Sequence, residues 1–186
     1  MPLSRERSGP WRAPARAGRA VAGTLLALAL GLLLAGVRAW DLDRMSAAAA
    51  RLGPGAAGGV KALQGLWPTV MDQPVGQQLQ AVNEFYNRRV SFRDDATVWG
   101  RTDYWATPLE MLGRGAGDCE DYAIAKYLTL VALGVPPPQL RLVYVRARLG
   151  GPGGPEQAHM VLAWYAAPEA EPQILDNLVT DIRPSS

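Results

Sequence analysis

Apolar side chains recur at helical spacing in two long stretches of the chain. In the first, residues 76–90, they form one stripe: Leu79, Val82, Phe85, Tyr86 and Val90. The second stripe begins shortly after Cys119 and contains Ile124, Ala125, Tyr127, Leu128, Val131 and Leu133. Gly134 and the prolines that follow it end this pattern, as expected at a helix C-terminus. We therefore predict two amphipathic helices, one over residues 76–90 and one from Cys119 to about Gly134.

Weaker signals predict two shorter helices and a long loop. Residues 44–52 predict a short helix, whereas Val60–Met71 fits no single period. The segment Thr107–Glu110 reads Thr-Pro-Leu-Glu, a capping box with proline at the first helical position, and predicts a helix that ends at Gly113. Ser91–Tyr104 carries acidic and aromatic residues without a clear period, so we predict a loop there.

The end of the chain changes character and predicts an antiparallel sheet. Leu140–Leu149 alternates apolar residues with arginines, as a half-buried strand does. A glycine- and proline-rich turn at residues 150–155 leads to a second predicted strand, Ala158–Ala166, and Gln173–Leu178 is a third. Helices followed by antiparallel strands indicate an α+β fold.

The N-terminal 39 residues have the composition of a targeting segment. Five arginines precede Ala20–Val37, which carries no charge and is rich in leucine and alanine. Val37-Arg38-Ala39 places small residues where a signal peptidase would cut, just before Trp40. We expect residues 1–39 to be a signal peptide. The alternative is an N-terminal membrane anchor, since the apolar run is about 18 residues long. Residues 40–186 then form one domain.

Removing that leader reverses the charge of the protein. The whole chain has 19 basic and 17 acidic residues, a net charge of +2. The part from Trp40 onward has 13 basic and 16 acidic residues, a net charge of −3. The basic character therefore belongs to the leader, and we expect no binding to nucleic acid.

The lone cysteine lies where a helix is predicted to begin. Cys119 follows a glycine-rich approach, with Asp118 as the expected N-cap and Asp121 three residues later. A helix N-terminus favours a thiolate over a thiol, and a thiolate attacks carbonyl carbons. The alternative is a small, buried, unreactive thiol. This context favours a nucleophile.

A base and its orienting group are available further along the chain. His159 is the only histidine and lies near the start of the second predicted strand; Asp176, followed by Asn177, lies on the third. Adjacent strands could bring these side chains together beside Cys119, giving nucleophile, base and orienting acceptor. The Cys119 backbone N–H is a candidate oxyanion donor. Each residue alone is more often structural, and the spacing does not support a zinc site.

These residues stand in motifs that resemble a known family. Gly117–Ala123 reads Gly-Asp-Cys-Glu-Asp-Tyr-Ala, preceded by Asp103–Pro108 and followed by Ala158–Leu162 and Leu175–Asn177. Together they closely resemble the bacterial transglutaminase-like cysteine proteinases, which include the LapG-type periplasmic proteases. The resemblance covers roughly Leu66 to the C-terminus, essentially all of the predicted domain.

The resemblance implies a fold, a site and a function. The fold is papain-like or transglutaminase-like, with the nucleophile at a helix N-terminus packed on a small antiparallel sheet. Cys119, His159 and Asp176 are then nucleophile, base and orienter. The function is that of a periplasmic endopeptidase that cleaves the N-terminal region of a large surface adhesin and so regulates biofilm attachment. An inner-membrane receptor for cyclic di-GMP is the implied regulatory partner.

The resemblance also implies calcium beside the nucleophile, and the matching residues are Asp118, Glu120 and Asp121. Clustered carboxylates suit this ion, although Asp118 and Asp121 could instead only cap the helix. The chain ends ten residues after Asp176, whereas the resemblance leads us to expect another strand, so the domain could be short at its C-terminus. Two further functions stay open: transglutaminase-like acyl transfer, and a non-catalytic binding module.

Overall fold

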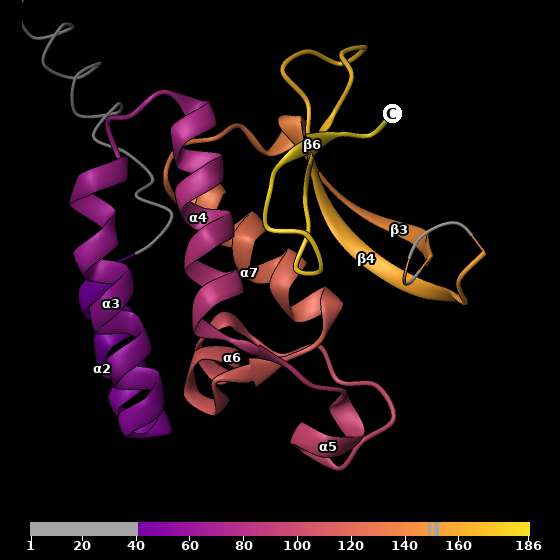
Figure 1. Cartoon of the computed structure of the whole chain (residues 1–186). Coiled ribbons are helices and arrows are strands. Elements are labelled where there is room, and N and C mark those ends of the chain that lie inside the picture. The colour runs from indigo at the N-terminus through magenta and orange to yellow at the C-terminus, as the bar shows by residue number, and fades with distance from the viewer. Residues whose placement is uncertain (1–40, 149, 151–152) are drawn as a thin grey trace, which may run out of the picture. The chain divides into compact units, whose positions relative to one another are not determined.

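The computed structural model describes residues 41–148, 150 and 153–186; the predicted leader, residues 1–39, lies outside them. The helices are α2 (Leu42–Leu52), α3 (Pro54–Val70), α4 (Val75–Arg89), α5 (Asp95–Trp99), α6 (Pro108–Arg114) and α7 (Cys119–Ala132). The strands are β1 (Ser91–Phe92), β2 (Ala116–Gly117), β3 (Leu140–Arg148), β4 (Glu156–Trp164), β5 (Gln173–Leu175) and β6 (Arg183–Pro184). Helices followed by an antiparallel sheet confirm the predicted α+β class (Figure 1).

The helical half begins with local capping signals. The Asp41 side chain accepts hydrogen bonds from the backbone N–H groups of Asp43 and Arg44, which begins α2 two residues before the predicted start. Gly53, at φ 114°, ends α2 and precedes α3, whose first residue is Pro54. The segment without a clear period is therefore helical. None of the described helices combines the length and the apolar character needed to cross a membrane.

The predicted loop Ser91–Tyr104 contains two elements that the sequence did not indicate. β1 pairs in parallel with β2, with Ser91 opposite Ala116 and Phe92 opposite Gly117. Short α5 begins at its cap Asp94, whose side chain accepts from the Thr97 N–H, and ends at Gly100 in the left-handed conformation. The loop prediction was wrong here because strands of two residues show no alternation.

The main sheet is antiparallel, with strand order β3-β4-β5-β6. β3 and β4 pair along their whole length, from Leu140 opposite Trp164 to Arg148 opposite Glu156. β5 ends at Leu175, earlier than predicted, so Asp176 follows the strand rather than lying on it. Beyond Asp176 the chain forms β6, which pairs with β5. The expectation that the domain is short at its C-terminus stays a prediction.

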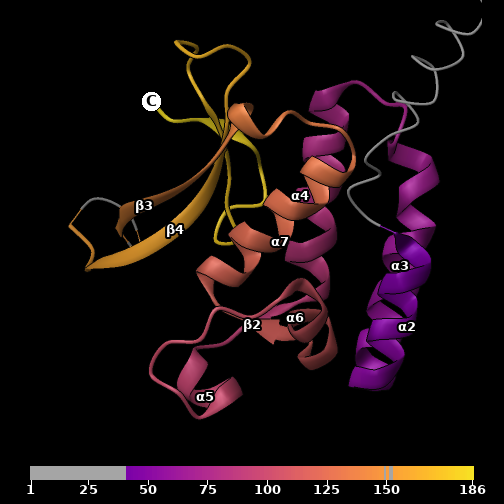
Figure 2. The ribbon, with the colours of Figure 1, turned by 180° about the vertical axis from the view of Figure 1, so that it is seen from behind.

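The core lies around α7, which packs between α4 and the sheet (Figures 1 and 2). Its buried members are Leu79, Val82, Tyr86, Val90, Met111, Leu112, Tyr122, Ala125, Leu130, Val135, Leu140, Leu162 and Leu175. The stripe predicted for α7 is only partly correct. Ile124, Tyr127 and Leu128 are partly exposed, whereas Lys126 and Thr129 are buried. A helix packed on two sides buries more than one stripe, and polar side chains then need internal partners.

Candidate active site

Cys119 is the first residue of α7, as the capping signals predicted. The Asp118 N–H donates to Asp121 Oδ2 at 3.4 Å, and the Ala106 N–H donates to Asp121 Oδ1 at 2.7 Å. Gly117 precedes the cap, and a Cβ atom there would lie 2.7 Å from Asp121 Oδ2. The absence of a side chain at Gly117 therefore allows Asp121 to hold the start of the helix in place.

His159 and Asp176 meet at the end of β5. His159 Nε2 lies 2.8 Å from Asp176 Oδ1, and the His159 side chain is buried. The same carboxylate oxygen accepts from the Leu178 N–H at 2.9 Å, and the Asp176 carbonyl oxygen accepts from Asn87 Nδ2 at 2.7 Å. The structure thus brings together two of the three predicted site residues, and Asp176 is held by hydrogen bonds from β4, from α4 and from the segment that follows β5.

The Cys119 thiol has a different partner. Its Sγ donates to Glu120 Oε2 at 3.2 Å, and among the described residues no hydrogen bond joins it to His159. Burial and the Glu120 hydrogen bond raise the pKa of Cys119 to about 12, opposed by a hydrogen bond from the Met160 backbone. Burial and the nearby carboxylates therefore oppose the thiolate that the helix N-terminus favours.

An acidic cluster surrounds the nucleophile and is larger than predicted. Potential ligand atoms lie within 4.8 Å of one another in three groups: Asp118, Cys119 and Glu120; Asp95, Asp118 and Asp121; and Asp95, Asp103 and Glu120. The sequence reasoning named Asp118, Glu120 and Asp121 but not Asp95 or Asp103, which it left in a loop. The one available signal was the acidic content of that segment.

The cluster has the properties of a cation site. Burial raises the pKa of Asp118 to about 8 and that of Asp121 to about 6, and neighbouring carboxylates add to both shifts. Asp95 Oδ1 and Asp118 Oδ1 are buried without a hydrogen-bond partner in the described part of the chain. Calcium prefers six to eight such oxygen ligands, so the donor set fits this ion.

A buried lysine interacts electrostatically with Asp176. Lys126 is 0% exposed and its Nζ lies 5.5 Å from the centre of the Tyr122 ring. Burial lowers the pKa of Lys126 to about 7, while the charge of Asp176 opposes this shift. The pKa of Asp176 is lowered. Burial by itself would raise it, but the His159 hydrogen bond and the Lys126 charge both lower it. The sequence reasoning missed Lys126 because a single lysine on a helix is usually exposed.

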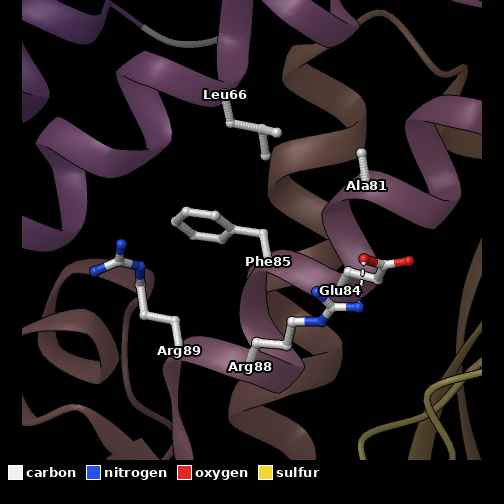
Figure 3. Close-up of a pocket in the computed structure, with 6 residues that line it drawn as sticks. All are labelled: Leu66, Ala81, Glu84, Phe85, Arg88 and Arg89. Carbon is white, nitrogen blue, oxygen red and sulfur yellow. Dashed lines mark ion pairs between the residues drawn. The ribbon is translucent and has the colours of Figure 1, made fainter.

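A surface hollow between α3 and α4 involves none of the site residues described above. A hollow of about 570 Å³ is lined by Leu66 of α3 and by Ala81, Glu84, Phe85, Arg88 and Arg89 of α4 (Figure 3). Arg88 pairs with Glu84 at 3.0 Å, and Arg89 lies over the Phe85 ring. None of these side chains contacts Cys119, His159 or Asp176, so this hollow is not part of the candidate active site.

A comparison with protein families identifies the family of this chain. A sequence profile described as bacterial transglutaminase-like cysteine proteinase matches residues 64–186. The chain belongs to this family. Cys119, His159 and Asp176 all lie in the matched part of this family member, as does the acidic cluster. A comparison with curated proteins gives no match.

Solved structures agree with the family. LapG of Legionella pneumophila is 37% identical, with a TM-score of 0.68, and the match covers 78% of this chain and 76% of that one. Its calcium-bound form gives a TM-score of 0.67 at 37% identity, covering 78% and 77% of the two chains. An EGTA-treated form is equally similar. The transglutaminase-like fold is therefore confirmed for this proteinase family member.

Proposed function

We propose that this chain is a cysteine endopeptidase in which Cys119 is the nucleophile, His159 the base and Asp176 the orienter. The observation that carries the proposal is the buried 2.8 Å contact between His159 Nε2 and Asp176 Oδ1, on a chain that belongs to a proteinase family. Because Nε2 is engaged by Asp176, Nδ1 is the ring nitrogen left to accept the thiol proton. Rotation of the Cys119 side chain away from Glu120 is then needed for contact.

The reaction proceeds by acyl transfer to sulfur. His159 takes the Cys119 proton as the thiolate attacks the peptide carbonyl carbon, and the Cys119 N–H is placed to bind the oxyanion. The C–N bond breaks, and His159 gives the proton to the leaving amine. Water, deprotonated by His159, then cleaves the thioester, which releases the carboxylate product and restores the thiol.

Calcium is the proposed ion of the acidic cluster. Asp118, Glu120 and Asp121 would hold it, together with Asp95 and Asp103, which come from the segment containing α5. When bound, it supplies positive charge that offsets the mutual repulsion of these carboxylates. The calcium-bound form of the Legionella LapG relative supports this proposal.

The proposed substrate is the N-terminal region of a large surface adhesin, cut in the periplasm to release the adhesin from the cell. An inner-membrane receptor for cyclic di-GMP is the proposed regulator. The resemblance of the motifs and the 37% identity to Legionella LapG support these assignments. The predicted leader, cleaved or kept as an anchor, would deliver the domain to that compartment.

Alkylation of the lone thiol tests the proposed function. Because Cys119 is the only cysteine, iodoacetamide modifies a single thiol, and the fraction modified can be read by mass spectrometry. We expect cleavage of an adhesin N-terminal fragment from the same organism to decline in proportion to modification. Cleavage that continues after complete alkylation would contradict the proposal, and a thiol that stays unreactive with no cleavage would favour a binding module.

Product analysis separates hydrolysis from acyl transfer. The reaction is run with and without a primary amine at high concentration, and the new C-terminus is analysed by mass spectrometry. We expect a free carboxylate in both cases, since water is the proposed second substrate. A product carrying the amine as its main form would instead identify the chain as an acyltransferase.

Calcium binding is expected to involve Asp95. Adding calcium to about 100 times its Kd should stabilise the chelator-treated protein by about 2.7 kcal/mol, which raises Tm by about 5–10 °C. Asp95→Asn should reduce this rise by at least half, because it removes charge from a buried ligand. Exposed Glu169→Gln serves as the control and should leave the rise unchanged. An equal calcium-dependent rise in Tm for both variants would show that Asp95 does not bind the ion.

A further inference from the structure

The β3–β4 hairpin carries exposed apolar side chains on an edge strand. Among the described strands, β3 pairs with β4 on one side and has no neighbour on the other, and the hairpin extends away from the helices (Figures 1 and 2). Leu142 is 40% exposed, Tyr144 65% and Val145 36%. Edge strands usually avoid such exposure, since they pair readily with other chains. Their presence here indicates a surface that is used.

This surface begins beside the nucleophile. Tyr144 lies directly opposite Met160, whose backbone hydrogen-bonds to the Cys119 sulfur. Burial raises the pKa of Tyr144, and the charges of Glu120 and Asp103 raise it further, as expected for a tyrosine near the acidic cluster. Tyr144 is therefore an exposed aromatic side chain in the neighbourhood of the reacting sulfur.

A hollow continues from that point along the hairpin. It has a volume of about 480 Å³ and is lined by Tyr144, Val145, Arg146, Glu156, Gln157 and Ala158. Arg146 lies opposite Ala158, and residues directly opposite one another project from the same face of a sheet. Tyr144, Arg146, Ala158 and Met160 therefore share one face. Four of the six lining residues, Tyr144, Arg146, Glu156 and Ala158, lie on the face that carries Met160.

The far end of this hollow has an excess of positive charge. Arg148 Nη2 lies 2.7 Å from Glu156 Oε1, and Arg146 Nη1 lies 3.9 Å from Glu156 Oε2. Two guanidinium groups thus share one carboxylate, which leaves a net charge of +1. The opposite end, at Tyr144, feels the negative charge of Glu120, Asp103 and Asp118. The hairpin therefore offers an aromatic contact near the nucleophile and a cationic contact further away.

We propose that this hollow is a substrate subsite, which binds an extended polypeptide segment with an apolar side chain on Tyr144 and an acidic side chain at Arg146. At about 3.3 Å per residue, Arg146 lies about 7 Å beyond Tyr144 along β3, so the acidic residue of the segment lies further from the scissile bond than the apolar one. The free edge of β3 offers backbone hydrogen bonds to the same segment. This inference rests on the proposed function, since it names the chemistry of the segment that would be cleaved.

Binding to an inactive variant tests the subsite apart from catalysis. The full chain carrying Cys119→Ala is titrated against a fluorescein-labelled twelve-residue peptide that repeats Val-Ser-Glu-Ser, which places valine and glutamate two residues apart on one face, and against the same peptide with glutamine in place of glutamate. Anisotropy gives each Kd. Arg146→Glu and Arg146→Gln test the charge, and Tyr144→Ala tests the aromatic contact. Arg183→Glu, which changes an exposed arginine at the other edge of the sheet, is the matched control.

The subsite predicts an ordered set of affinities. The glutamate peptide should bind at least about tenfold tighter than the glutamine peptide, a difference that Arg146→Glu removes and Arg183→Glu retains. Arg146→Gln should give an intermediate value, and Tyr144→Ala should weaken both peptides by about tenfold. Absence of binding, no preference for glutamate, or equal effects of Arg146→Glu and Arg183→Glu would each overturn the inference.

The proposed function can fail independently. If the inactive variant binds the glutamate peptide as expected but Cys119-dependent cleavage is not found, only the proposed function is overturned. If cleavage of the adhesin fragment depends on Cys119 while Arg146→Glu leaves its kcat/KM unchanged, only the subsite is overturned.

Discussion

Replacing Asp176 by alanine is expected to lower kcat for peptide hydrolysis by about 10⁴-fold and to leave the fold intact. The carboxylate accepts the Nε2–H of His159 at 2.8 Å, which keeps the proton on Nε2 and leaves Nδ1 free to accept. Alanine offers no acceptor, so neither the orientation of the ring nor the position of its proton is fixed. Asparagine should cost less, because its amide oxygen can accept from both His159 and the Leu178 N–H as the carboxylate does.

Single-turnover kinetics on the adhesin fragment measures this effect. Asp181→Ala is the matched control, since Asp181 is an exposed carboxylate on the same C-terminal segment that forms an ion pair with Arg183. Because His159 is the only histidine, its ring resonances can be followed by NMR, and the alanine variant should lose the fixed Nε2–H tautomer. An Asp176→Ala protein that keeps more than a tenth of the activity would refute the role given to Asp176.

Introducing a methyl group at Gly55 is expected to destabilise the fold by about 2–3 kcal/mol. A Cβ atom there would collide with the Gly113 carbonyl oxygen, and one at Gly59 would lie 2.7 Å from Leu112 Cβ. These contacts join α3 to α6, and α6 leads directly into the β2 approach to Cys119. Because the obstacle at Gly55 is backbone, relief requires the two helices to separate.

Thermal unfolding of Gly55→Ala compared with Gly58→Ala provides the measurement. Both glycines lie in α3, but a Cβ at Gly58 meets nothing within 4 Å. Gly58→Ala should therefore stabilise the helix by up to about 1 kcal/mol, whereas Gly55→Ala should lower Tm by about 5–10 °C. Similar changes in the two variants would mean that the α3–α6 contact adapts easily.

Local signals placed the helices and the long strands well. The capping box at Thr107–Glu110 and the N-cap at Asp118 are complete within one turn of chain, so their geometry does not depend on distant residues. α3 was not assigned because glycine and alanine, which allow its close contact with α6, give no apolar stripe. β1 and β2 were missed because residues 91 and 116 pair across a long sequence separation.

By itself, the sequence determined that Cys119 begins a helix and that one histidine follows it on a strand, with one Asp-Asn pair further along the chain. Those features depend on caps and periodicity, which act over a few residues. Only the tertiary structure decided the environment of the thiol. The thiol donates a hydrogen bond to Glu120. Asp95 and Asp103 join the acidic cluster, and Lys126 lies buried near Asp176. Burial and Coulomb interactions sum over residues from every element, so no local pattern encodes them.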